Sequence, residues 1–195
     1  MTYVLMRCEN GKWYWGTLLY SLSLACGYML YWCICLLMPI VTNIEWSSDW
    51  GKIWNTLCQT SAYYEFEIAV KMPYALLAYN GGTALILSIA LKLIYSWMIS
   101  CIMLIFNTPW RIPFGTTASI LLMLQDYFAM NGRGYAYYWY SPATMSRLSM
   151  LDSTDTFLQP CPEEAICVLI SIVAVVGMTG WLICRVVDIN KNTRA

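Results

Sequence analysis

Residues 17–41, TLLYSLSLACGYMLYWCICLLMPIV, contain no Asp, Glu, Lys or Arg. At about 1.5 Å of helical rise per residue, about 20 apolar residues cross a hydrocarbon core about 30 Å thick. A buried helix of a soluble protein is rarely so long and so apolar on every side. A secretory signal peptide has a shorter apolar core and a small-residue cleavage site, and we find neither here. The stretch therefore predicts the first crossing of a membrane.

The composition of the whole chain also indicates a membrane protein. Of its 195 residues, 59% are apolar and 11% are charged, whereas an ordinary soluble domain carries about 25% charged residues. Its 15 tyrosines and 10 tryptophans suit the boundary between membrane and water. The formal net charge is zero, which gives no reason to expect binding to nucleic acid.

The chain contains no histidine, which limits the chemistry that it can perform. Histidine is the usual axial ligand of haem, a common ligand of zinc and copper, and the usual general base of enzymes. We therefore expect no catalytic residues, no cofactor and no metal site. The chain is predicted not to be an enzyme.

Three further apolar stretches, 76–106, 114–130 and 165–184, complete a predicted all-α transmembrane four-helix bundle, with residues 1–195 forming one membrane domain. The second stretch contains Lys92 and the pair Gly81 and Gly82. Division into two crossings at Lys92 is the alternative, but no turn-forming residues surround it. We expect one tilted helix, in which the two glycines bend the helix or let another backbone approach.

The distribution of charge predicts the orientation of the bundle. The N-terminal segment, the turn around Arg111 and the C-terminal tail have net charges of +1, +1 and +2, whereas the loops 42–75 and 131–164 each have −2. Because basic segments stay in the cytoplasm, we expect both termini to be cytoplasmic and both larger loops to lie outside. The alternation of Glu-Phe-Glu-Ile at 65–68 predicts a short β-strand in the first loop. Cys58 and Cys161, in the two outer loops, are candidates for a disulfide bond.

Lys92 and Asp126 are charged residues inside predicted crossings. A charge at the centre of a membrane costs about 2.5–3.5 kcal/mol on insertion scales, so such residues are candidates for function. We predict that they form an intramembrane charge pair, with a role in an ion or proton path as the alternative. The outer loops also carry aromatic residues that we expect either to bind a partner or to pack within the loops and the interface, namely Trp46, Trp50, Trp54, Tyr137 and Trp139.

The first loop also carries Trp46, followed by Gly51, Trp54 and Cys58. This order, together with a short start, four crossings and a short turn between the middle two, resembles the claudin superfamily. Members of that family have a Trp, a Gly-Leu-Trp motif and two cysteines in the first loop, and this chain has one of the two cysteines. The resemblance implies a claudin-like protein of cell junctions, or an auxiliary subunit that modulates a channel.

These features predict a non-enzymatic, multi-pass integral membrane protein. We expect it to act by lateral assembly, and by loop-mediated adhesion or modulation of a larger membrane protein. Its expected partners are membrane lipids and either other membrane protein subunits or further copies of itself. The plasma membrane is the favoured location. The alternatives are an accessory subunit of a respiratory or ATP synthase type complex in the mitochondrial inner membrane, and a small ion channel or carrier.

Overall fold

The computed structural model describes residues 10–38, 50–52, 56, 60, 78–107, 114–131, 136–151 and 159–186. Within these residues every regular element is helical and there is no β-strand. The strand predicted at 65–68 lies outside the described residues. The elements are α2 (Asn10–Leu37), α6 (Gly81–Asn107), α7 (Phe114–Asn131), α8 (Ala136–Tyr140), α9 (Pro142–Met145), the 3-10 helix η2 (Leu148–Met150) and α10 (Pro162–Val186).

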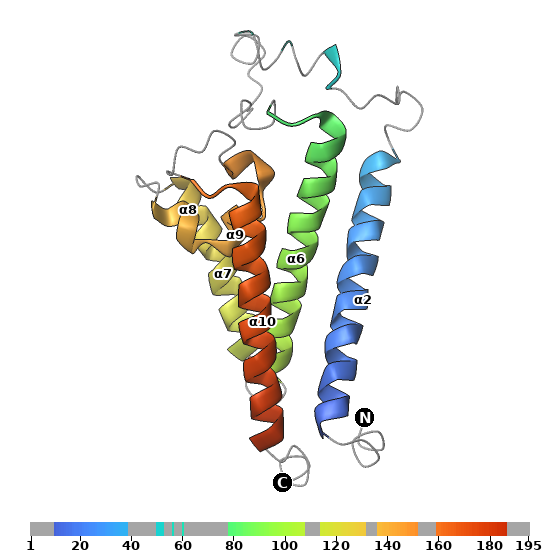
Figure 1. The fold of residues 1–195 in the computed structure, drawn as a ribbon, viewed down its shortest axis with the longest axis vertical. Helices are drawn as coiled ribbons and strands as arrows, with labels where there is room; N and C mark the ends of the chain where they lie inside the picture. The colour runs from blue at the N-terminus through green and yellow to red at the C-terminus, as the bar shows by residue number, and fades with distance from the viewer. Residues whose placement is uncertain are drawn as a thin grey trace.

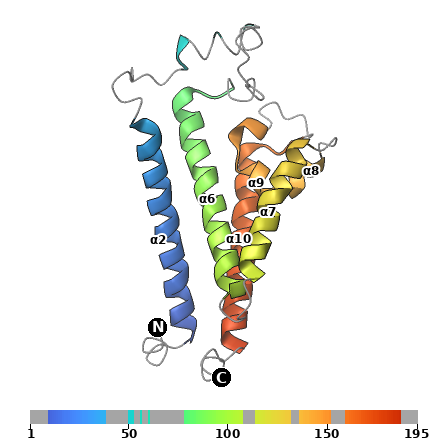
Figure 2. The same ribbon diagram turned by 180° about the vertical axis from the view of Figure 1, so that it is seen from behind.

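The four longer helices alternate in direction, and the first residue of α2 lies at the same end of the molecule as the last residue of α10 (Figures 1 and 2). Three of them are long and apolar enough to span a membrane: Gly11–Leu37, Gly81–Asn107 and Pro162–Cys184. These helices indicate an integral membrane protein with an all-α fold. The first span begins six residues earlier than the sequence predicted, because the mixed segment before residue 17 continues the same helix.

Helix α6 is continuous through Lys92, which confirms one helix rather than a hairpin divided at this residue. It begins at Gly81, five residues later than predicted, so the glycine pair occupies its first turn. A Cβ atom added to Gly82 would meet no atom within 4 Å. Among the described residues, no other backbone of this chain therefore approaches Gly82, and a bend at the glycine pair stays a prediction.

Helix α7 is about 27 Å long at 1.5 Å per residue, shorter than the other three long helices. Its apolar part, Phe114–Gln125, is too short to qualify as a span by length and composition. The short helices α8, α9 and η2 follow it (Figure 1). Helix α9 packs against α7, α10 and α6, while α8 packs against α7 and α9, and η2 against α6 and α9. Pro142, Ala143, Thr144 and Met145 of α9 are all buried there.

The turn from α6 into α7 is fixed by one side chain and one glycine. Asn107 Oδ1 accepts a hydrogen bond of 2.9 Å from the backbone N–H of Gly115, which satisfies a donor at the start of α7. A Cβ atom on Gly115 would lie 2.8 Å from Met103 Cα. The two helices therefore meet closely at this end, and only glycine fits the contact.

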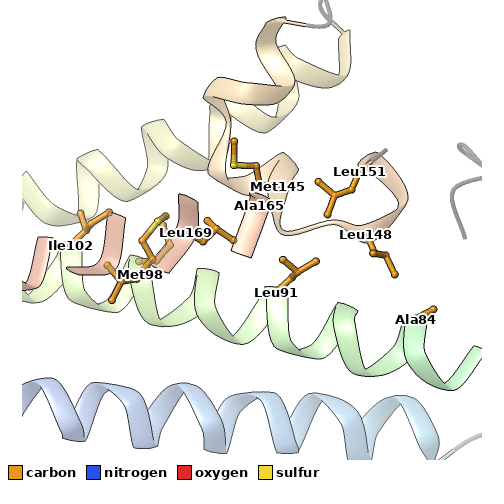
Figure 3. Packing of buried hydrophobic residues seen from close by; sticks show 11 residues of the cluster. Ala84, Leu91, Met98, Ile102, Met145, Leu148, Leu151, Ala165 and Leu169 are labelled. Atoms are coloured by element: carbon orange, nitrogen blue, oxygen red, sulfur yellow. The ribbon is translucent and has the colours of Figure 1, made fainter. Parts of the chain in front are cut away.

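The main core lies between α6, α10 and the α9–η2 segment, on the side of α6 away from α2 (Figure 3). Ala84, Leu91 and Met98 of α6 repeat every seven residues, which places them on one face of the helix. The same core includes Met145, Leu148 and Leu151 from the α9–η2 segment, and Ala165, Leu169 and Val173 from α10.

Helix α2 packs against α6 and α10 through a narrow buried stripe consisting of Tyr14, Leu18, Ser21, Ala25 and Met29. The hydroxyl of Tyr14 donates a hydrogen bond of 2.9 Å to the backbone carbonyl of Gly177 in α10. A Cβ atom on Gly180 would overlap the Tyr14 hydroxyl and the side chain of Ile105. Gly180 therefore forms a notch that admits the tyrosine, as expected of a glycine at a helix contact in a membrane.

Hydroxyl side chains within the spans are satisfied by their own helix. Ser21, Ser96 and Ser171 each donate a hydrogen bond of 2.7 Å to a carbonyl oxygen three or four residues earlier. Such bonds allow a hydroxyl to lie in a hydrocarbon environment without a partner from another helix.

Replacement of Gly180 by Ala should lower the stability of the bundle by about 1–3 kcal/mol, the cost of overpacking a well-packed site, although alanine is intrinsically the better helix former. The matched control is Gly27→Ala, because a Cβ atom at Gly27 meets nothing within 4 Å. Thermal unfolding in detergent should show a lowered midpoint for the first variant only. Equal midpoints for the two variants would contradict the notch.

Candidate functional site

Lys92 lies near the middle of α6, about 17 Å from its first residue at 1.5 Å per residue. Its side chain reaches α2, where Nζ lies 5.9 Å from the centroid of the Trp32 ring. This distance is within the range of a cation–π interaction, which is stronger where water is excluded. The structure thus places a cation of a membrane-spanning helix against an aromatic ring of its neighbour.

The Lys92 side chain lines a cavity of about 340 Å³. Tyr28, Met29 and Trp32 of α2 form one wall. Residues of α6 (Tyr95 and Ser96), of α7 (Met123) and of the α9–η2 segment form the others. Four parts of the chain that are distant in sequence therefore meet at this cavity.

Arg147 adds a second cation to the cavity. Its position is fixed by the backbone of the α9–η2 segment: its N–H donates to the Thr144 carbonyl at 3.0 Å, and its carbonyl accepts from the Met150 N–H at 2.9 Å. Ser141 starts α9 as its N-cap, with its hydroxyl accepting a bond of 3.3 Å from the Thr144 N–H. The buried segment therefore holds Arg147 where it faces the same space as Lys92.

Asp126 lies in α7, three residues after Met123. Residues three apart share a face of an α-helix, and Met123 lines the cavity that Lys92 lines. The backbone positions are thus compatible with the predicted pair. The Asp126 side chain lies outside the described residues, and the pair stays a prediction.

Trp50, predicted to bind a partner, packs against the main core. Its ring N–H donates a hydrogen bond of 2.7 Å to the Tyr79 carbonyl, just before α6 begins. An indole held in this way has a clear structural role in joining the first loop to α6. This contact supports the alternative that the aromatic side chains pack within the loops.

The other aromatic residues proposed for partner binding are not brought to the same place. Trp139 lies in α8 and is exposed. Tyr137 lies in the same short helix, but its side chain is outside the described residues, as are Trp46 and Trp54. Cys58 is also outside them, so the predicted disulfide with Cys161 stays a prediction.

Cys161 precedes α10, and its N–H donates a 3.0 Å hydrogen bond to the carboxylate of Glu164. Pro162 occupies the first helical position, and Glu163 and Glu164 lie in the first turn. Proline and acidic residues are both favoured there. Glu163 and Glu164 therefore belong to the first turn of α10, whereas the sequence predicted them at the end of the loop 131–164.

Sequence reasoning missed Arg147, Trp32 and Tyr14 as members of interhelical contacts. Arg147 lies in a stretch without a long apolar pattern. Trp32 lies in a run that is apolar on every side, so the sequence does not indicate which face of the helix contacts α6. Tyr14 lies before the uncharged run. Its spacing of four residues from Leu18 was the available signal, since such a spacing places both residues on one helix face.

The sequence matches no protein-family profile, and no match was found among curated proteins or among solved structures. The resemblance to the claudin superfamily therefore stays a prediction.

Replacement of Trp50 by Phe should remove the bond to the Tyr79 carbonyl while most of the ring packing remains. A lost hydrogen bond of about 1 kcal/mol corresponds to about fivefold faster amide exchange, if local opening limits exchange. Hydrogen exchange read by mass spectrometry over residues 78–84 measures this effect. Trp139→Phe is the matched control, because Trp139 is exposed in α8, and it should leave exchange in this segment unchanged.

If Lys92 and Asp126 form a pair, Lys92→Met alone should destabilise the protein by about 3 kcal/mol, because it leaves a carboxylate without its counter-charge. The double replacement Lys92→Met with Asp126→Asn should be much closer to the wild type. Unfolding midpoints in detergent measure both, with Lys12→Met near the start of α2 as the control. Equal losses for the single and the double variant would count against the pair.

Proposed function

We propose that this protein is a non-enzymatic membrane protein that assembles laterally with other membrane proteins or with further copies of itself. In this proposal α7, completed by α8, α9 and η2, forms a fourth crossing, and both termini lie in the cytoplasm. The outer loops then face away from the cytoplasm and contribute to adhesion or to modulation of a larger partner.

The observation that carries this proposal is the outward face of α2. Gly16, Tyr20, Ser23, Gly27 and Tyr31 are all exposed on this helix. These five residues are spaced by four, three, four and four positions, which places them on one face of the helix. The buried stripe from Tyr14 to Met29 has the same spacings and lies on the opposite face.

The chemistry of this outward face supports contact with another helix more than contact with lipid alone. A Cβ atom at Gly16 or Gly27 would meet nothing within 4 Å, and small residues let the backbones of two membrane helices approach closely. Tyr20 and Tyr31 are 61% and 67% exposed, and tyrosine hydroxyls favour a polar partner over hydrocarbon. A neighbouring helix with hydrogen-bonding groups would satisfy them.

Replacement of Gly27 by Leu should weaken lateral assembly by about tenfold or more, because a branched side chain would hold the partner's backbone away. The matched control is Ala174→Leu, which enlarges an exposed residue on α10. Energy transfer between labelled copies in lipid vesicles measures self-association. Gentle-detergent purification followed by mass spectrometry measures association with other membrane proteins.

Loss of either association in Gly27→Leu, with retention in Ala174→Leu, would support the proposal. If the wild type stays monomeric in vesicles and purifies without other membrane proteins, lateral assembly is ruled out. Stable co-purification with respiratory subunits would identify the partner as an energy-converting complex, the alternative expected from the sequence.

A further inference from the structure

We propose that the cavity between α2, α6, α7 and the α9–η2 segment binds the ring of a quinone, a flat and uncharged molecule that dissolves in the hydrocarbon of a membrane. The ring lies between the aromatic side chains of the cavity, and its carbonyl oxygens point toward Lys92 and Arg147, which both line it. This inference requires that the chain crosses a membrane. It requires neither lateral assembly nor any reaction of the quinone.

The depth of the cavity favours an uncharged ligand. Lys92 lies about 17 Å from the first residue of α6 at 1.5 Å per residue, near the middle of a spanning helix. In a hydrocarbon core about 30 Å thick, this position is well below the surface where charged headgroups lie. A neutral ring reaches it without the cost of taking a charge into hydrocarbon.

The size and the lining of the cavity fit a substituted ring. Its volume is about 340 Å³, whereas a cavity of about 150 Å³ in another protein is large enough for benzene. Tyr28, Trp32 and Tyr95 supply aromatic rings from two helices, and Met29 and Met123 supply thioether groups. Aromatic side chains stack on other rings, and methionine adapts to their shape and makes favourable contacts between sulfur and ring. A flat ring therefore matches these walls.

The donors of the cavity favour a ring that carries carbonyl oxygens. Ser96 and Ser146 donate their hydroxyl hydrogens to the carbonyls of Lys92 and Ala143, each at 2.7 Å. The charged groups of Lys92 and Arg147 carry three and five N–H donors, respectively. Because a carbonyl oxygen needs only one of these donors, it binds alongside the other partners of both side chains. The contact therefore does not depend on the net charge of the cavity.

The cavity opens toward lipid, from which a quinone would enter. Helices α2 and α7 lie on opposite sides of α6 (Figures 1 and 2). Tyr28 of α2 is 62% exposed and Met123 of α7 is 52% exposed, and both line the cavity. The last residues of α2, from Leu30 to Leu37, are exposed except for Cys33, which is half-buried. A ring can therefore enter beside this end of α2 without separating the main core.

The test uses the full chain in phosphatidylcholine vesicles with a photoactivatable benzoquinone. The probe carries an azido group and is substituted at every other ring position, so that it does not add to cysteine thiols. Mass spectrometry should find the label on the cavity-lining peptides of α2 and α7. An excess of the unlabelled quinone should reduce labelling by about tenfold by mass action, whereas the hydrocarbon tail alone should not. Labelling that the quinone does not reduce, or that the tail reduces equally, would overturn the site.

A second probe tests the role of the carbonyl oxygens. The corresponding azidobenzene has the same tail and lacks both carbonyls. It should label the cavity at least about tenfold less, as expected from the loss of hydrogen bonds to charged donors. Equal labelling by the two probes would overturn the choice of a quinone.

A variant that fills the cavity tests its position. Ser96→Phe should reduce labelling by about tenfold, because the added ring occupies the space of the ligand. Ser171→Phe is the matched control: Ser171 also bonds at 2.7 Å to a carbonyl four residues earlier, but it is exposed on α10. This control should leave labelling unchanged. Unchanged labelling in Ser96→Phe, or an equal loss in Ser171→Phe, would contradict the site.

Trp32→Leu decides the outcome if Ser96→Phe does not fold, which circular dichroism in detergent checks. Loss of one aromatic wall should reduce labelling by about fivefold. Trp15→Leu is the control, because it removes an exposed ring near the other end of α2. Equal labelling of the two folded tryptophan variants would count against binding between the aromatic walls.

Discussion

The contact between Tyr14 and the glycines of α10 determines how α2 joins the bundle. In a membrane the hydrophobic effect does not favour contact between two helices over contact between a helix and lipid. Close packing and interhelical hydrogen bonds must therefore stabilise the association of helices. The hydroxyl of Tyr14 bonds to the Gly177 carbonyl, and its ring fits where Gly180 has no side chain. Around this contact lies a second core, formed by Tyr14, Leu18, Cys101, Ile105 and Cys184. This end of α2 is fixed, and the far end, beyond Met29, has few buried residues.

The division of α2 into a fixed part and a largely exposed part explains the position of the cavity. Among the described residues, the main core joins α6, α10 and the α9–η2 segment without a contribution from α2. The C-terminal part of α2 therefore lies beside a core that is already complete without it. There it faces the side of α6 that carries Lys92. The aromatic ring of Trp32 lies over the ammonium group there. A lysine near the middle of a spanning helix is tolerated because its long side chain reaches an aromatic ring and a cavity with polar walls.

The sequence was sufficient to predict the all-helical fold and the approximate positions of the long helices, because an uncharged apolar run of more than about 20 residues is rare outside a membrane-spanning helix. The continuity of α6 through Lys92 also followed from the absence of turn residues. The burial of most of residues 141–151 could not be predicted, since SPATMSRLSML contains no apolar run and carries an arginine. It is buried because α9 packs against α7, α10 and α6 and η2 packs against α6, which is a property of the assembled bundle. Lys92 was recognised as unusual by its charge, whereas Arg147 lay in a segment with the polar composition of an ordinary outer loop.

The two faces of α2 differ in what they require from their surroundings. The buried face, from Tyr14 to Met29, is complementary to α6 and α10 and needs no further partner. The outward face presents small residues and tyrosine rings at the same spacing, so it satisfies the geometric condition for a second helix contact. Lipid can cover the leucines of this helix at little cost, but it cannot supply hydrogen bonds to hydroxyl groups in the hydrocarbon region. The cavity and the outward face therefore share one physical basis: polar groups on α2 and its neighbours are positioned where hydrocarbon chains alone would leave them poorly solvated.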